Sequence, residues 1–157
     1  MKTVDASMQL SHATHFEHVS SIADDGIQDV LSGWDEGELG RGFYTATTLA
    51  GSAAYLSESG AVLEFLTNRK MTGFAVRPAA SFDWDGAGRG EEIKKLSNEY
   101  DYLVSSTDGS IVDYSVSQVK INFKSTQILE LVAVHLMEDG DWKRYLIQEY
   151  RNLFLDS

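Results

Sequence analysis

Three short segments of the chain hold residue types that can do chemistry, and the first is built on histidine. His12 and His15 lie in segment 10–15, and His18 follows three residues later. Three histidines spaced by three would stack on one face of a helix, where imidazoles can bind a metal ion. No acidic ligand motif accompanies them. The alternative is one structural histidine at the end of a strand and two exposed histidines on a helix.

The second segment joins a Gly-rich turn to an aromatic strand, with the sequence Gly40-Arg41-Gly42-Phe43-Tyr44. Glycine lets the backbone approach a ligand closely, arginine offers a planar donor for phosphate or carboxylate, and tyrosine can stack on a flat ring. The strand, Gly-rich turn and helix of a dinucleotide-binding fingerprint do not surround this segment. A tight turn into a core strand is the alternative.

The third segment alternates polar and apolar residues. Gln118 and Lys120 lie on one face of the predicted strand, and Val119 and Ile121 lie on the other. Such alternation is typical of a strand with one buried face. The polar face either meets a ligand or is a solvated edge of the sheet, and from this segment alone a solvated edge is the expectation.

Hydrophobic spacing and turn residues place these segments in an α+β chain. Strands are predicted at 8–14, 42–46, 62–66, 72–76, 102–105, 116–123 and 129–137. Helices are predicted at 16–25, 47–59, 91–98 and 141–154, and Gly26 follows the first of them as a C-terminal cap. Helices and strands interleave early and strands dominate later. We therefore expect one α+β domain over residues 1–157 rather than a regular βαβ repeat.

The composition limits the classes of function. The chain has 157 residues, 13 basic and 24 acidic side chains, a formal net charge of −11 and no cysteine. Disulfides, thiolate zinc sites and thiol nucleophiles are therefore excluded. A strongly acidic chain binds a nucleic-acid backbone poorly through bulk charge, although a local basic pocket is compatible with it. No apolar run is long enough to span a bilayer and no signal peptide is visible, so we expect a soluble protein.

Taken together, the order and spacing of the three segments resemble the ADP-ribosyltransferase-like superfamily, in particular its bacterial toxin-type members. The matching motifs are Ser11-His12-Ala13-Thr14, Leu39-Gly40-Arg41-Gly42-Phe43-Tyr44-Thr45-Ala46 and Ser117-Gln118-Val119-Lys120-Ile121-Asn122-Phe123-Lys124. The resemblance covers residues 10–134, with a match only in outline over 60–98. It implies a split β-sandwich, in which two small sheets with flanking helices enclose a cleft for NAD.

The resemblance implies a role for each motif in binding or cleaving NAD. His12 would hydrogen-bond the ribose hydroxyls on the adenosine side, and Tyr44 would stack on nicotinamide. Gln118 would hold the nicotinamide ribose and favour an oxocarbenium-like transition state. The residues that would line the NAD site around them are Ala13, Thr14, Arg41, Gly42 and Phe43.

The pyrophosphate of NAD needs local positive charge in so acidic a chain. Arg41 is the first candidate, followed by Arg69, Lys70 and Lys120. Nicotinamide leaves as a neutral molecule, so the expected chemistry uses neither a metal nor a thiol.

The chain departs from the family pattern at three positions. Ser11 stands where an aromatic residue is usual, Ala13 where glycine is usual, and Gln118 where many members carry glutamate. An amide cannot act as a general base, but it can orient a hydroxyl and stabilise positive charge. These properties favour NAD hydrolysis, or transfer to a good nucleophile, over transfer to an acceptor that needs a strong base.

We therefore expect an NAD-cleaving enzyme, an ADP-ribosyltransferase or NAD glycohydrolase, that acts as a bacterial toxin or effector in the cytoplasm of a target cell. Its expected partners are NAD and either a protein acceptor or an immunity protein, with no membrane; charge disfavours a nucleic-acid acceptor. Two alternatives stay open. One is an acidic immunity or adaptor protein that binds a basic toxin, and the other is a non-catalytic NAD-binding module of the same fold.

Overall fold

The computed structural model of the chain describes residues 2–4, 9–27, 39, 42–47, 60–76, 87–105 and 118–155. The strands in this part are β1 (Lys2–Val4), β2 (Gln9–His15), β3 (Phe43–Ala46), β4 (Gly60–Thr67), β5 (Met71–Val76), β6 (Tyr102–Ser105), β7 (Gln118–Ile121), β8 (Leu129–Glu138) and β9 (Asp141–Leu146). The helices are the 3-10 helices η1 (Phe16–His18) and η4 (Phe123–Ile128), the α-helices α1 (Val19–Asp25), α3 (Ala87–Glu99) and α4 (Ile147–Tyr150), and a π-helical turn (Arg151–Leu155). The helix predicted over 47–59 lies outside the described residues apart from Thr47.

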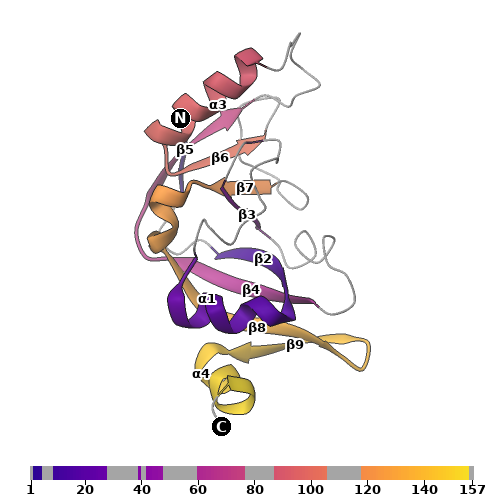
Figure 1. The fold of residues 1–157 in the computed structure, drawn as a ribbon. Coiled ribbons are helices and arrows are strands. Elements are labelled where there is room, and N and C mark those ends of the chain that lie inside the picture. Colours follow the sequence, from indigo (N-terminus) through magenta and orange to yellow (C-terminus); the bar gives the residue numbers. More distant parts are fainter. Residues whose placement is uncertain are drawn as a thin grey trace.

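The strands form one mixed sheet in the order β1-β5-β6-β7-β3-β2-β4-β8-β9 (Figure 1). Neighbouring strands are antiparallel, except that β5 and β6 run parallel with α3 between them in the chain. The α+β class is therefore confirmed. The prediction of two separate small sheets is wrong, because β2 and β3 pair with each other through Ser11 and Ala46 and so join the described strands in one sheet.

The junction between β2 and β3 nevertheless divides this sheet into two halves. Among the described residues, Ser11 and Ala46 are the one Cα pair of the junction, whereas β2 pairs with β4 along its whole length from Gln9 to His15. Longer ladders hold together the half β1-β5-β6-β7-β3 and the half β2-β4-β8-β9. Figure 1 shows α3 beside the first half and α1 and α4 beside the second, with the two ends of the chain at opposite ends of the molecule.

Two apolar clusters lie on opposite faces of the sheet. Tyr102 and Val104 of β6 belong to the larger cluster, to which α1 contributes Ile22. Leu103, between them, belongs to the smaller cluster, to which α3 contributes Ile93. Because successive residues of a strand point to opposite faces, α1 and α3 pack on different sides of the sheet.

The C-terminal segment differs from its prediction. The helix predicted over 141–154 is wrong, because Asp141–Leu146 form strand β9 and the chain becomes helical only at Ile147. Asp139 and Gly140 have φ angles of 52° and 85°, as in the type I′ turns that join two antiparallel strands. The apolar spacing of this segment fits a helix as well as a strand, and the pairing of β9 with β8 decides between them.

Glu64 carries a buried carboxylate in the middle of β4, with 6% of its side chain exposed. Arg144 donates from Nε and Nη2 to the two carboxylate oxygens, at 2.9 Å each. His135 Nε2 lies 2.9 Å from Oε1, and Gln9 Nε2 donates to Oε2 at 2.7 Å. The Arg144 hydrogen bonds, supported by those of His135 and Gln9, lower the pKa of Glu64 to about 2. One carboxylate therefore links β4 to β2, β8 and β9.

Glu64→Gln should lower the free energy of unfolding by about 2–4 kcal/mol at neutral pH, because it removes a charged acceptor from a buried network. The stabilisation by the carboxylate is complete above its unfolded pKa of 4.5 and is lost as the pH falls from there toward 2. Urea unfolding of both proteins from about pH 7 to about pH 3 measures both effects.

Glu130→Gln is the matched control, because Glu130 is an exposed carboxylate on the neighbouring strand β8. Its effect should stay within about 0.5 kcal/mol. Equal stability of Glu64→Gln and the unmodified chain would mean that the network contributes nothing net.

Candidate functional site

The three predicted segments meet at the centre of the sheet. Their strands are neighbours in the order β7-β3-β2. Ser11 pairs with Ala46, and Ala46 pairs with Gln118, so that one residue from each segment stands in a single row across the three strands. Because neighbouring strands lie about 4.8 Å apart, this row spans only roughly 10 Å.

His12 follows Ser11 on β2 and is buried. Its ring stacks on Phe43, with the ring centroids 4.0 Å apart and the planes at 27°. Its Nδ1 lies 2.6 Å from the backbone carbonyl oxygen of Tyr44. A carbonyl oxygen only accepts, so the imidazole carries its proton on Nδ1 and has its acceptor at Nε2. His12 thus connects β2 to β3 beside the Ser11–Ala46 pair.

Burial lowers the pKa of His12 from 6.5 to about 4, and the hydrogen bond to the Tyr44 carbonyl opposes this shift only in part. The imidazole is therefore neutral at neutral pH. A neutral imidazole suits the predicted role of accepting a ribose hydroxyl, but it supplies no positive charge to a pyrophosphate.

Tyr44 and His12 meet through the backbone rather than through their rings. The Tyr44 ring packs against the smaller cluster, and its hydroxyl accepts a hydrogen bond of 3.2 Å from the Leu39 backbone N–H. His12 stacks on Phe43, which belongs to the larger cluster on the other face. The two rings therefore lie on opposite faces of the sheet, on either side of the β2–β3 junction.

The remaining predicted site residues are only partly within the described chain. Ala13 and Thr14 lie on β2 and pair with β4, where Ala13 is half-buried and Thr14 is buried. Arg41 and the side chain of Gln118 lie outside the described residues. The backbone pairing with Ala46 alone places Gln118.

The burial of Lys120 differs most from its prediction. The solvated edge expected for its face is wrong, because β7 lies between β6 and β3 and Lys120 is fully buried. Its Nζ donates to Ser97 Oγ at 2.9 Å and to Asn122 Oδ1 at 2.5 Å. Burial lowers the pKa of Lys120 to about 8. The available sequence signal was a lysine between two apolar residues, Val119 and Ile121.

Gly42 makes room for the stem of this lysine. A Cβ atom at position 42 would overlap Lys120 Cδ and would lie 2.9 Å from the carbonyl oxygen of Ile121. Tyr44, two residues further on, pairs directly with Lys120. The close approach that the sequence predicts for a ligand at Gly42 is thus made by the Lys120 side chain.

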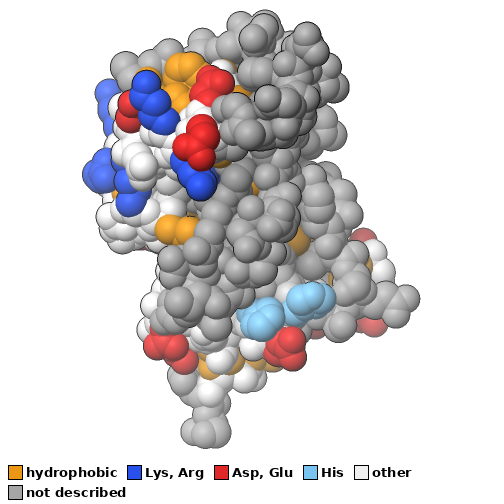
Figure 2. Space-filling view, turned by 45° about the horizontal axis from the view of Figure 1, so that its top comes forward, with side chains coloured by type: hydrophobic (Ala, Val, Ile, Leu, Met, Phe, Trp, Pro, Cys, Tyr) orange, Lys and Arg blue, Asp and Glu red, His pale blue; other side chains and the backbone are white. Residues whose placement is uncertain are grey.

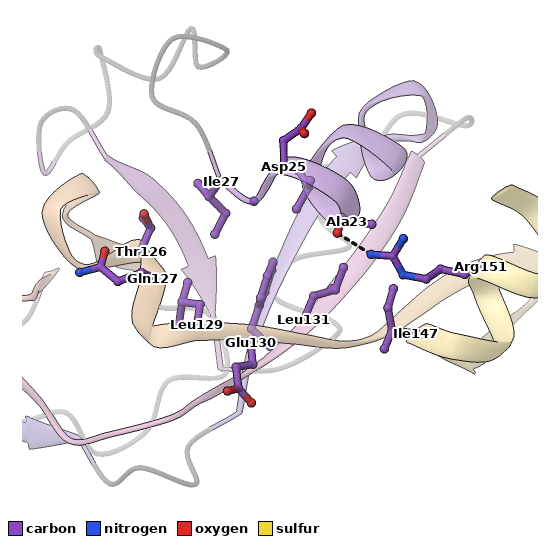
Figure 3. A pocket seen from close by; sticks show the side chains of 13 residues that line it. Ala23, Asp25, Ile27, Thr126, Gln127, Leu129, Glu130, Leu131, Ile147 and Arg151 are labelled. Atoms are coloured by element: carbon purple, nitrogen blue, oxygen red, sulfur yellow. Dashed lines mark hydrogen bonds between the residues drawn. The ribbon is translucent and has the colours of Figure 1, made fainter. Parts of the chain in front are cut away.

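A groove of about 510 Å³ lies between the end of α1, the start of β8 and α4 (Figure 3). The apolar side chains along it are Ile22, Ile27, Phe65, Leu129, Leu131 and Ile147. The ring of Phe65 meets Phe43 edge-on, with centroids 5.6 Å apart, so the groove borders the core that supports His12. Sequence reasoning missed this groove because its walls come from segments far apart in the chain.

Five described cations lie near the end of the molecule that carries α3, whereas Lys143, Arg144 and Arg151 lie on β9 and the C-terminal helical turn. On the face in Figure 2, the Lys and Arg side chains lie toward the end that carries α3, and the histidines lie toward the opposite end. The exposed cations of the turn between β4 and β5, of α3 and of η4 are Arg69, Lys70, Lys94, Lys95 and Lys124.

The three histidines at spacing three do not form one stack. His12 is buried on β2, whereas His15 and His18 are exposed and their rings meet at an angle, with centroids 6.1 Å apart. Glu17 lies 3.7 Å from His18. Within the described residues, no three His, Asp or Glu side chains are grouped so that they could hold a metal ion.

Comparison with known proteins assigns no family. No protein-family model matches the chain, and no curated protein matches it. Among the described helices, none has the length and apolar character needed to cross a membrane. A functional proposal therefore depends on the site geometry and on the motifs.

The shifted pKa of His12 should make stability depend on pH. The unfolded imidazole binds a proton near pH 6.5, and the folded one near pH 4. Stability is then constant above about pH 6.5 and falls as the pH drops toward 4, by at most about 1.4 kcal/mol per pH unit. We expect urea unfolding at about pH 7 and about pH 4.5 to differ by about 2 kcal/mol.

His12→Gln should flatten this pH dependence, because it removes the titrating group. His15→Gln is its control, since His15 is exposed on the same strand and should leave the slope unchanged. An unaltered slope in His12→Gln would assign the loss of stability to other groups.

Gly42→Ala should destabilise the protein by about 1–3 kcal/mol, because the added methyl group overlaps the Lys120 stem. The φ angle of Gly42 is not positive, so the backbone itself accepts alanine. In a Lys120→Met background the same change should cost less, because the flexible methionine stem can move aside. Urea unfolding of the four proteins gives the coupling, and an equal cost in both backgrounds would contradict the overlap.

Proposed function

We propose that the chain cleaves NAD at the bond between nicotinamide and ribose, as an ADP-ribosyltransferase or NAD glycohydrolase. The observation that carries the proposal is the row of Ser11, Ala46 and Gln118. Short motifs that match a family by their order need not meet in space, yet the strands of these three motifs are neighbours.

The β2–β3 junction is where the proposal places nicotinamide and its ribose. In the part of the chain that the structure describes, the backbone ladder here is the Ser11–Ala46 pair, with His12 packed on one face and Tyr44 on the other. Under the proposal Tyr44 offers its ring to nicotinamide, and neutral His12 accepts a ribose hydroxyl. Gln118, in register with Ala46, holds the nicotinamide ribose.

The residue types suit a dissociative cleavage. Nicotinamide departs as a neutral molecule, so the step needs little acid or base assistance. The protein has to hold NAD and stabilise the positive charge that develops on the ribose. The amide of Gln118 can present its carbonyl oxygen to this charge, but it cannot deprotonate an acceptor. Water or an intrinsically reactive nucleophile is therefore the proposed acceptor.

Local cations rather than bulk charge would hold the pyrophosphate. Lys120 is buried and donates to Ser97 and Asn122, so we assign it to positioning β7 against α3. Arg41 stays the first candidate, because it directly precedes Gly42 and the strand that carries Tyr44. In this acidic chain of net charge −11, one arginine at the junction would matter more than the average charge.

Incubation with NAD, followed by measurement of released nicotinamide, tests the proposal. Gln118→Ala should lower turnover by about 10²–10³-fold, which is typical of losing one group that stabilises transition-state charge. Gln148→Ala is the matched control, because Gln148 is an exposed glutamine on α4, and it should keep full turnover. Unfolding curves of the three proteins check that each variant is folded.

Each other outcome has a defined meaning. NAD binding in calorimetry without nicotinamide release would favour the non-catalytic NAD-binding module. Absence of both binding and release at high protein concentration would overturn the proposal. Full turnover of Gln118→Ala would show that the third motif is assigned wrongly.

The proposal extends to a toxin or effector that depletes NAD in the cell that contains it. Expression of the unmodified chain should then slow growth of a bacterial host, and expression of Gln118→Ala should not. An immunity or adaptor protein would slow growth in neither case.

A further inference from the structure

Ser11 projects to the face of the sheet that carries Tyr44, whereas His12 projects to the other face. Ser11 pairs with Ala46, and residues directly opposite each other on antiparallel strands share a face. Tyr44 shares the face of Ala46, because side chains alternate along β3. His12 stacks on Phe43, which precedes Tyr44 and lies on the opposite face. At this point of β2, Ser11 is therefore the residue on the side of the Tyr44 ring.

The hydroxyl of Ser11 is available to a ligand, although the residue is only 7% exposed. Within the described chain this hydroxyl makes no side-chain hydrogen bond, whereas the Thr45 hydroxyl on the opposite face donates to the Val119 carbonyl at 2.7 Å. Among the described side-chain polar atoms, Tyr102 Oη is the one that is both unpaired and closed off from solvent. The Ser11 hydroxyl therefore stays in contact with solvent and keeps its donor and its acceptor.

The two cross-strand neighbours of Ser11 leave its hydroxyl unused. Ala46 on β3 presents only a methyl group. Glu64 on β4 pairs with Ser11, but its carboxylate accepts its hydrogen bonds from Arg144 and Gln9 and contacts His135. Both neighbours are buried, so this part of β2 is held in place by the sheet itself. A ligand would meet a hydroxyl that is already positioned, which lowers the entropic cost of binding.

We propose that the Ser11 hydroxyl binds the carboxamide of nicotinamide and makes Ser11 a specificity-determining residue of the NAD site. This inference rests on the proposed function. Gln118 lies at the far end of the row from Ser11 and is assigned to the nicotinamide ribose, so the pyridine ring lies above Ala46 and its carboxamide reaches Ser11. A hydroxyl can donate to the carboxamide oxygen or accept from its N–H group.

Nicotinamide and 3-methylpyridine test this inference without turnover, because they share the pyridine ring and differ in the carboxamide. Backbone amide shifts in NMR titrations, at a pH where both rings are neutral, give affinity and location. The unmodified chain should bind nicotinamide about five- to tenfold more tightly than 3-methylpyridine, as one hydrogen bond between neutral groups allows. The largest shifts should lie at Ser11 and Ala46. Ser11→Ala should reduce the preference to less than about twofold.

The variants separate a lost contact from a lost fold. Ser11→Ala removes a hydroxyl that has no partner in the described chain, so its urea midpoint should equal that of the unmodified chain. Ser11→Thr keeps a hydroxyl and should retain a preference for nicotinamide. Ser20→Ala is the matched control, because Ser20 is exposed on α1, and it should keep the full preference.

Turnover gives a second measurement. Ser11→Ala should raise the KM for NAD and the inhibition constant of nicotinamide by about five- to tenfold each, because both ligands carry the carboxamide. The inhibition constant of ADP-ribose should not change, because ADP-ribose lacks it.

The outcomes distinguish this inference from the proposed function. NAD turnover in which Ser11→Ala alters neither the nicotinamide preference nor the two constants would overturn the inference and leave NAD cleavage standing. Shifts centred away from Ser11 and Ala46 would place the carboxamide elsewhere and overturn it as well. Absence of both nicotinamide binding and NAD turnover in the unmodified chain would overturn the inference together with the proposed function.

Discussion

The backbone pair of Ser11 and Ala46 joins two halves of a sheet that are otherwise held by longer ladders. The hydrogen bond from His12 to the Tyr44 carbonyl reinforces this junction with a side-chain contact. Burial keeps that imidazole neutral, so the junction is weakened when acid protonates it. Because the junction also brings the three motif strands together, the stability of the fold and the geometry of the proposed site depend on the same contact.

Glu64 and Lys120 are buried charged side chains in the two halves of the described sheet, and their charges are compensated differently. Glu64 is paired with the guanidinium of Arg144, which keeps the carboxylate ionised and ties β4 to the edge strand β9. Lys120 donates to the neutral partners Ser97 and Asn122, and its pKa falls toward neutrality. A buried charge tolerates little displacement of its partners, so both groups favour one strand register over its alternatives.

The net charge of the chain does not show where its exposed cations lie. In a chain of net charge −11, exposed cations lie on the turn between β4 and β5, on α3, on η4 and on β9. Phe65 and Phe43 connect the floor of the groove between α1, β8 and α4 to His12. The groove and the proposed NAD site therefore share one core.

The sequence by itself determined the α+β class, most strand positions and the helices at 16–25 and 91–98, which correspond to η1 with α1 and to most of α3. These features are local, because hydrophobic period and capping residues act over a few neighbouring residues. It did not determine that segment 141–146 is a strand, because its apolar spacing also fits a helix and only β8 distinguishes the two. Nor did it show that Lys120 is buried against Gly42, or that Ser11, Ala46 and Gln118 share a row. Those features depend on pairing between strands far apart in the chain, where a residue's environment is set by neighbours that the local sequence does not contain.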